Sequence, residues 1–125
     1  MTENEISKMV YDLCLMIHRK YGPGLFERVY EEILCYELNK MNIYFTRQEE
    51  IQLVHEEIKM EVGFKADVII EHKVILELKS VEGLMPVHYK QLLTYLKLTD
   101  LKLGLLINFN VNLMKDGIHR IVNKL

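Results

Sequence analysis

Apolar positions in the first third of the chain recur at helical spacing and predict two amphipathic helices. The first is expected from Asn4 to Lys20 and the second from Leu25 to Lys40, with Tyr21-Gly22-Pro23-Gly24 as the break between them. The buried side of the second helix is expected to consist of Phe26, Val29, Tyr30, Ile33, Leu34 and Leu38.

The middle of the chain has the pattern of β-strands. Three strands are predicted in succession, at Ile43–Val54, Ile58–Ile70 and Val74–Lys79. The polar turns Glu56-Glu57 and Glu71-His72-Lys73 separate them, and Gly63 is expected to bend the second strand. Consecutive strands with short turns predict an antiparallel meander.

The last third predicts a helix followed by a buried strand. Pro86 stands at a favourable first-turn position for a helix that runs to about Thr99. The continuous apolar run Leu103–Phe109 then reads as a strand, and its arrival after a helix favours parallel pairing with a meander strand. Val111–Met114 and Ile118–Val122 predict a small terminal hairpin. Residues 1–125 are expected to form one domain.

Charged side chains interrupt the two apolar strands around His72. If the hairpin is centred on His72, Asp67 faces Glu77, and the two carboxylates share one face with Cβ atoms about 5 Å apart. Two unit charges about 4 Å apart repel by roughly 4 kcal/mol at an effective dielectric near 20, so a proton or a cation is expected there. Lys79 points to the same side of its strand as Glu77.

A solvated edge hairpin is the alternative interpretation of these charges. It would also alternate charged and apolar residues, with Lys79 as a surface partner of Glu77. Ile69 and Ile75 fall on the carboxylate side, however, where a solvated face would be polar. We therefore interpret the three charges as a D…ExK site.

The composition limits the cellular location, the type of metal ligand and the type of partner that can be expected. With 50% hydrophobic and 27% charged residues, and without an apolar run of roughly 18 residues or a signal peptide, the chain is expected in the cytoplasm. Cys14 and Cys35 form no CxxC pair, and the five histidines show no zinc-binding spacing, so oxygen ligands are favoured over a zinc site. A net charge of −2 and a pI near 6.2 disfavour a protein that coats nucleic acid.

An αβββαβ core whose second and third strands carry Asp and Glu-x-Lys resembles the PD-(D/E)XK nuclease superfamily. Gly24-Leu25-Phe26-Glu27-Arg28-Val29-Tyr30 also matches the motif of the GxxExxY protein family in that superfamily, and the likeness extends from about Tyr21 to Val122. Further similar stretches are Val74–Lys79, Pro86-Val87-His88, Gln91–Leu96 and Gly104–Asn110. The resemblance implies a restriction-endonuclease-like α/β fold with an extra N-terminal helix and a C-terminal hairpin.

The resemblance also implies roles for the candidate residues. Asp67 and Glu77, with the carbonyl of Leu78, would hold Mg²⁺ or Mn²⁺. Lys79 would orient or help to deprotonate the attacking water. Either Glu27 or Glu31, one turn apart on the second helix, would supply a further carboxylate; the alternative is a solvated helix face.

Gln91 and Tyr95 form a QxxxY pair with His88 one turn earlier, which looks like the RecB-type motif. Gln91 is therefore expected beside the reacting water or a phosphate. Tyr95, His88 and Tyr30 are expected on the substrate side, with ordinary packing as the alternative for both tyrosines.

Two functions follow as hypotheses. The first is a metal-dependent nuclease acting on DNA as a homodimer, selective for structure rather than sequence because 125 residues leave little room for a DNA-reading subdomain. The second is a non-catalytic module of the same fold that binds a protein or nucleic acid partner, which the mild acidity favours.

Overall fold

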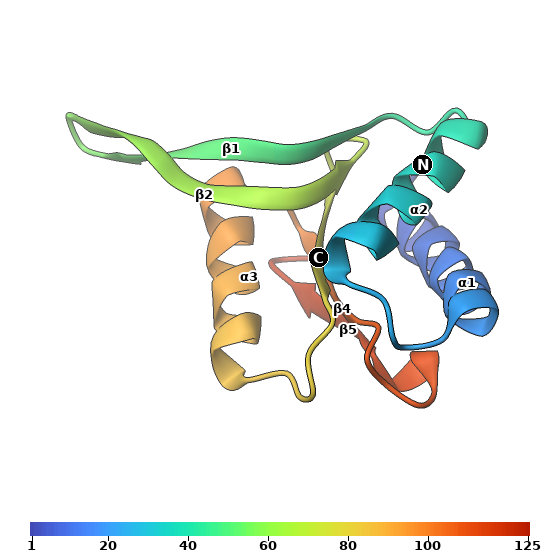
Figure 1. Ribbon diagram of the computed structural model, residues 1–125. Helices are drawn as coiled ribbons and strands as arrows, with labels where there is room; N and C mark the ends of the chain where they lie inside the picture. Colours follow the sequence, from blue (N-terminus) through green and yellow to red (C-terminus); the bar gives the residue numbers. More distant parts are fainter.

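The computed structural model describes the backbone of residues 1–125 and the side chains of residues 1–60 and 63–125. The elements are α1 (Glu3–Tyr21), α2 (Glu27–Lys40), β1 (Phe45–His55), β2 (Ile58–Ile70), β3 (Val74–Lys79), α3 (Pro86–Thr99), β4 (Leu103–Asn108), the 3₁₀ turn η1 (Met114–Asp116) and β5 (Ile118–Val122). The strands form one mixed sheet in the order β1-β2-β3-β4-β5, which confirms the predicted α/β fold (Figure 1).

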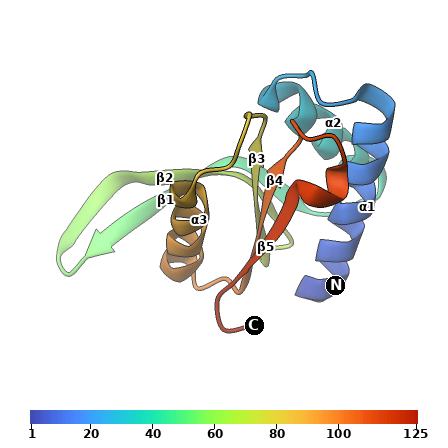
Figure 2. The same cartoon turned by 90° about the horizontal axis from the view of Figure 1, so that it is seen from below.

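Helices cover both faces of the central strands. Figures 1 and 2 show α1 and α2 on one side of β3 and β4, and α3 on the other. The α1–α2 side encloses the larger hydrophobic core, and α3 contributes Leu92 and Leu96 to a second core against Ile75 and Leu106. Because both faces are covered, β4 is a continuous run of buried residues. None of the helices in the described residues is long and apolar enough to cross a membrane.

The ends of α1 follow local sequence signals. Thr2 and Glu5 form a reciprocal capping box, in which Thr2 Oγ1 accepts from the Glu5 N–H over 3.1 Å and Glu5 Oε1 accepts from the Thr2 N–H over 2.8 Å. The helix ends at Gly22, whose φ of 74° lies in the left-handed region that glycine adopts readily.

The second helix begins two residues later than predicted, and this exposes part of its expected apolar side. Phe26 stands before the first turn and is 83% exposed, while Val29 points to solvent. The prediction that both are buried is wrong, because Tyr30, Leu34 and Leu38 face the core and Glu31 shares that face with them.

The strand pairing confirms most of the predicted topology. Ile70 pairs with Val74 and Ile69 with Ile75, as expected for a hairpin centred on His72. The crossover through α3 places β4 parallel to β3.

The predicted terminal hairpin is wrong, because β5 pairs antiparallel with β4, and residues 111–114 form no strand. An unpaired edge of the buried β4 would leave backbone groups without partners, and β5 satisfies them.

The hairpin of β1 and β2 extends beyond the rest of the sheet. β2 pairs with β3 only from Val68 to Ile70, whereas its pairing with β1 continues to Ile58. The unaccompanied part projects past α3 as a two-stranded arm (Figures 1 and 2). Phe64, at the base of the arm, stacks on Tyr95 of α3 with ring centroids 3.7 Å apart.

Candidate functional site

Asp67 and Glu77 lie side by side where the β2–β3 ladder ends. The last paired residues are Val68 and Leu76. Beyond them, Asp67 Oδ2 accepts a hydrogen bond from the backbone N–H of Leu78 over 2.8 Å. Glu77 Oε1 accepts a longer bond, 3.4 Å, from the backbone N–H of Asp67. Where the backbone pairing stops, hydrogen bonds from backbone N–H groups to these two carboxylates thus join β2 to β3.

Both carboxyl groups are disfavoured as anions. Glu77 is 8% exposed, and burial followed by the charge of Asp67 raises its pKa to about 8. Burial also raises the pKa of Asp67, while hydrogen bonds from the Leu78 N–H and from Gln48 act in the opposite direction. The arrangement favours a shared proton, or a cation that replaces it.

Lys79 lies half-buried two residues beyond Glu77, at the end of β3. Its positive charge acts to lower the pKa of Glu77, but among the residues with described side chains its ammonium group forms no ion pair. Its backbone carbonyl accepts from the N–H of Phe109 over 3.0 Å, which fixes the strand end. The ammonium group therefore lies near enough for its charge to act on Glu77, and it forms no salt bridge with the described side chains.

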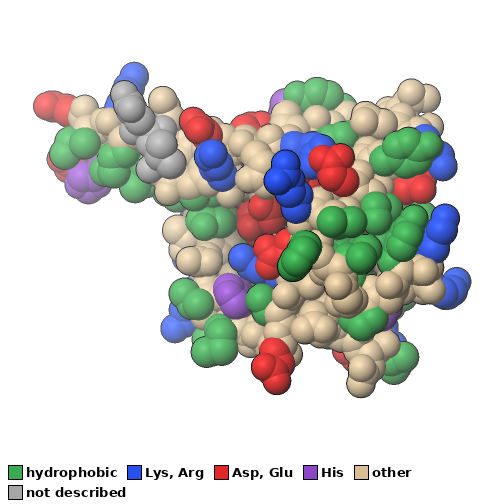
Figure 3. All heavy atoms as spheres, viewed as in Figure 1, with side chains coloured by type: hydrophobic (Ala, Val, Ile, Leu, Met, Phe, Trp, Pro, Cys, Tyr) green, Lys and Arg blue, Asp and Glu red, His purple; other side chains and the backbone are tan. Residues whose placement is uncertain are grey.

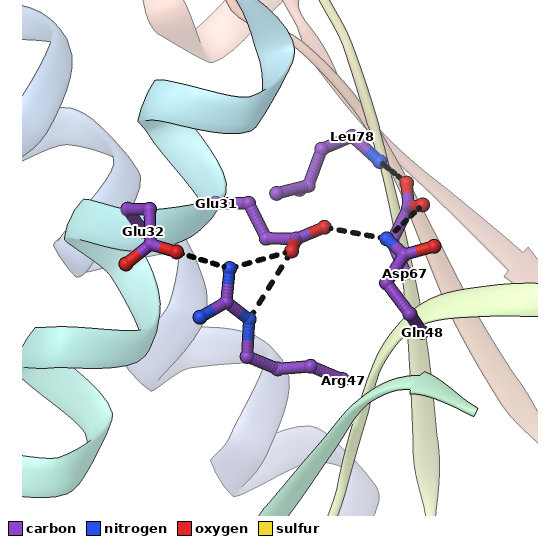
Figure 4. Close-up of polar contacts among 6 residues, drawn as sticks. All are labelled: Glu31, Glu32, Arg47, Gln48, Asp67 and Leu78. Atoms are coloured by element: carbon purple, nitrogen blue, oxygen red, sulfur yellow. Dashed lines mark hydrogen bonds and ion pairs between the residues drawn. The ribbon is translucent and has the colours of Figure 1, made fainter.

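Of the two helix carboxylates, Glu31 is the one that reaches this region. It is 7% exposed and accepts from Arg47 Nη2 over 2.8 Å and from Arg47 Nε over 3.1 Å. Its other oxygen accepts from Gln48 Nε2 over 2.9 Å, and the same nitrogen donates to Asp67 Oδ1 over 3.1 Å (Figure 4). Arg47 also binds the exposed Glu32 over 2.8 Å.

Glu27 lies one turn earlier and is exposed. Its Oε1 accepts from the backbone N–H of Ser80 over 3.1 Å, so it joins the start of α2 to the loop after β3. A pocket of about 460 Å³ lies between α2 and the sheet, lined by Glu27, Arg28, Glu31, Glu32, Arg47, Gln48, Asp67 and Leu78. Figure 3 shows acidic side chains gathered near the centre of this face, with Lys and Arg side chains beside them.

Of the three α3 residues that the sequence singles out, Tyr95 lies near enough to the acid pair for the charges of Glu77 and Asp67 to act on it. Tyr95 is half-buried, and its stacking on Phe64 agrees with the packing alternative; burial, then the charges of Glu77 and Asp67, raises its pKa. Gln91 is exposed one turn earlier. His88 accepts from the Met85 N–H at its Nδ1 over 3.0 Å and so closes the first turn of α3. What these side chains do to a substrate stays a prediction.

The substrate-side prediction is wrong for Tyr30. The side chain is fully buried, stacks on Phe109 with centroids 4.1 Å apart, and donates from its hydroxyl to the Gly22 carbonyl over 2.5 Å. The same hydroxyl accepts from the Leu25 N–H over 3.1 Å. Tyr30 therefore holds the α1–α2 connection in place, out of reach of a substrate.

The sequence pattern does not predict Arg47 and Gln48 as site residues. Both stand in β1, and their bonds to Glu31 span sixteen and seventeen residues. The available signal is their position on a strand next to the one that carries Asp67.

The donor set fits a hard divalent cation. Among the described residues, no group of three or more His, Cys, Asp and Glu side chains lies together as a preformed metal cluster. Asp67 and Glu77 nevertheless provide two adjacent carboxylates, and oxygen ligands of this kind suit Mg²⁺ and Mn²⁺.

Metal-free protein is expected to lose stability as the pH rises from about 5 to 8. The pKa of Glu77 is near 8 in the folded chain and near 4.5 when unfolded, so the folded state binds more protons in this interval. The contribution is fully present below the lower value and is lost through the upper one. Its size is on the order of 3 kcal/mol. Urea denaturation in EDTA at pH 5 and 8 measures it.

Glu77→Gln should remove this component of the pH dependence, whereas Glu57→Gln, at an exposed turn, should retain it. Equal slopes for wild type and Glu77→Gln would show that Glu77 titrates normally.

Comparison with known proteins places this site in a family. The model of the PD-(D/E)XK nuclease superfamily matches residues 4–121. No curated protein and no solved structure matches the chain. Since the matched region spans nearly all of the sequence and carries the acid pair with its neighbouring lysine, the protein belongs to the PD-(D/E)XK nuclease superfamily.

Proposed function

We propose that the chain is a metal-dependent nuclease of the GxxExxY type, which hydrolyses DNA phosphodiester bonds and selects substrate structure rather than sequence. One observation carries the proposal: the buried Glu77 lies against Asp67, with the ammonium group of Lys79 beside them and outside any ion pair of the described side chains. Membership of a superfamily that usually contains nucleases supports it.

Asp67 and Glu77 are the residues that would hold Mg²⁺ or Mn²⁺, with the Leu78 carbonyl as a further oxygen ligand. The bound ion supplies Lewis acidity and offsets the negative charge of a phosphodiester. It would also offset the repulsion from Asp67, which adds to the larger effect of burial in raising the pKa of Glu77.

Three further residues contact the attacking water or position the metal-binding carboxylates. Lys79 donates a hydrogen bond to the attacking water and orients it toward the phosphorus. Gln91, exposed on α3, contacts the water or a phosphate oxygen. Glu31 is held by Arg47, so its contribution is to place Asp67 through Gln48.

Lys79→Ala should reduce metal-dependent cleavage by about 100-fold or more, because a positioned proton donor or acceptor contributes on that scale. Supercoiled, single-stranded, flapped and four-way-junction DNA and an RNA are incubated with the protein and Mg²⁺ or Mn²⁺. Lys97→Ala, which removes the same charge from an exposed position in the last turn of α3, should cleave like wild type. Equal activity of both variants would exclude a role for Lys79.

The second candidate is a non-catalytic module that binds a protein or nucleic acid partner. The net charge of −2 favours it, as does the pairing of Arg47 with two glutamates, which leaves this guanidinium less available to a phosphate.

Calorimetry with Mn²⁺ separates the two candidates. A nuclease site should bind the ion and lose it in Asp67→Ala, while Asp12→Ala, on the exposed side of α1, should leave binding unchanged. If the wild type binds no Mn²⁺ and cleaves none of the DNA and RNA substrates, the non-catalytic binding module is the better candidate.

We further propose that the active form is a homodimer, because a single copy of 125 residues offers little surface for a nucleic acid duplex. Sedimentation velocity should show dimers at micromolar to millimolar protein concentration. Monomers alone throughout that range would contradict the proposal.

A further inference from the structure

Gln48 interrupts β1 with an unusual backbone conformation. Its φ is 50°, in the left-handed region that glycine and asparagine favour and that a long side chain rarely adopts. The β1–β2 register pairs Arg47 with Val68 and Glu49 with Ala66, and it omits the intervening pair, Gln48 and Asp67. The irregularity therefore falls on the two residues of this pair.

Both strands exchange their faces at this point. Side chains at even spacing along a strand share a face, yet Val68 packs in the α1–α2 core while Ala66 packs in the α3 core. In β1, Phe45 packs against the first core and Ile51 against the second. The change of face removes Gln48 from the regular alternation, and its side chain lies between α2 and β2 (Figure 4).

One amide nitrogen then joins two carboxylates from different elements. Gln48 Nε2 donates to Glu31 Oε1 over 2.9 Å and to Asp67 Oδ1 over 3.1 Å, which uses both of its hydrogens. The second oxygen of each acid is also bound, by Arg47 in the case of Glu31 and by the Leu78 N–H in the case of Asp67. Gln48 thus completes a continuous chain of hydrogen bonds from the Glu31–Arg47 ion pair, which joins α2 to β1, to the acid on β2.

The chemistry of an amide suits this position. A lysine or arginine here would form an ion pair with Asp67 and compete with a metal ion for it. A third carboxylate would add repulsion to a group that burial already penalises. Glutamine supplies two donors without charge, and it leaves the negative charge of Asp67 available.

We propose that Gln48 is a positioning residue, which fixes the carboxylate of Asp67 by joining it to the Glu31–Arg47 ion pair. The left-handed backbone conformation of Gln48 directs its side chain toward both acids. The role in metal binding rests on the proposed function. The hydrogen-bonded coupling between β1, α2 and β2 does not.

Two variants separate the side chain from the backbone. Gln48→Ala removes the amide and keeps an unfavourable φ, whereas Gln48→Gly removes the amide and relieves the φ. Both should bind Mn²⁺ about 10- to 100-fold more weakly than wild type, as measured by calorimetry. Gln48→Gly should nevertheless melt at a higher temperature than Gln48→Ala. Gln52→Ala, an exposed glutamine on the same strand, is the matched control and should bind Mn²⁺ normally.

A double-mutant cycle tests the coupling without metal. In EDTA, urea denaturation is compared for wild type, Gln48→Ala, Asp67→Ala and the double variant. Non-additive effects support the bridge, and additive effects overturn it. Wild-type Mn²⁺ affinity in Gln48→Ala would also overturn the positioning role. If the wild type itself binds no Mn²⁺, the proposed function fails, and the cycle alone decides the coupling.

Discussion

The adjacency of two carboxylates, the buried Glu77 and the half-buried Asp67, is the constraint around which the rest of the site is arranged. Water would screen such a pair on an exposed sheet, but here burial strengthens the repulsion. The backbone pairing of β2 with β3 ends at this point. The Leu78 N–H donates to Asp67, and the Asp67 N–H donates to Glu77. Lys79 adds positive charge nearby. With both acids ionised, Asp67 and Glu77 carry two negative charges against the single positive charge of Lys79, an excess that a shared proton or a divalent cation would relieve.

Hydrophobic packing brings the distant elements to that pair. Tyr30 stacks on Phe109 and so presses α2 against the sheet, which carries Glu31 to the edge of the site. Glu27 holds the loop after β3 through the Ser80 N–H. In this chain the glutamate and tyrosine of the Gly24–Tyr30 motif thus form contacts that join segments, and the acid that reaches Asp67 lies one residue beyond the motif.

The sequence was sufficient for features that depend on local patterns. The hairpin around His72 follows from a polar loop between two β-rich runs, and α3 begins at the proline that predicts it. The role of Gln48 was not predictable, because a left-handed residue in a strand is normally signalled by glycine or asparagine. Two other features also depend on tertiary contacts. These contacts determine that α2 begins after Phe26, which leaves Phe26 exposed, and that β5 pairs with the edge of β4.

The arm of β1 and β2 begins at the acid site, where the pairing of β2 with β3 ends. Beyond the stacked rings of Phe64 and Tyr95, the arm is held by its own cross-strand hydrogen bonds. Its root is the pair at which both strands exchange faces, Gln48 and Asp67. The two strands that form the arm therefore carry, at its root, the two residues that are hydrogen-bonded to each other inside the site.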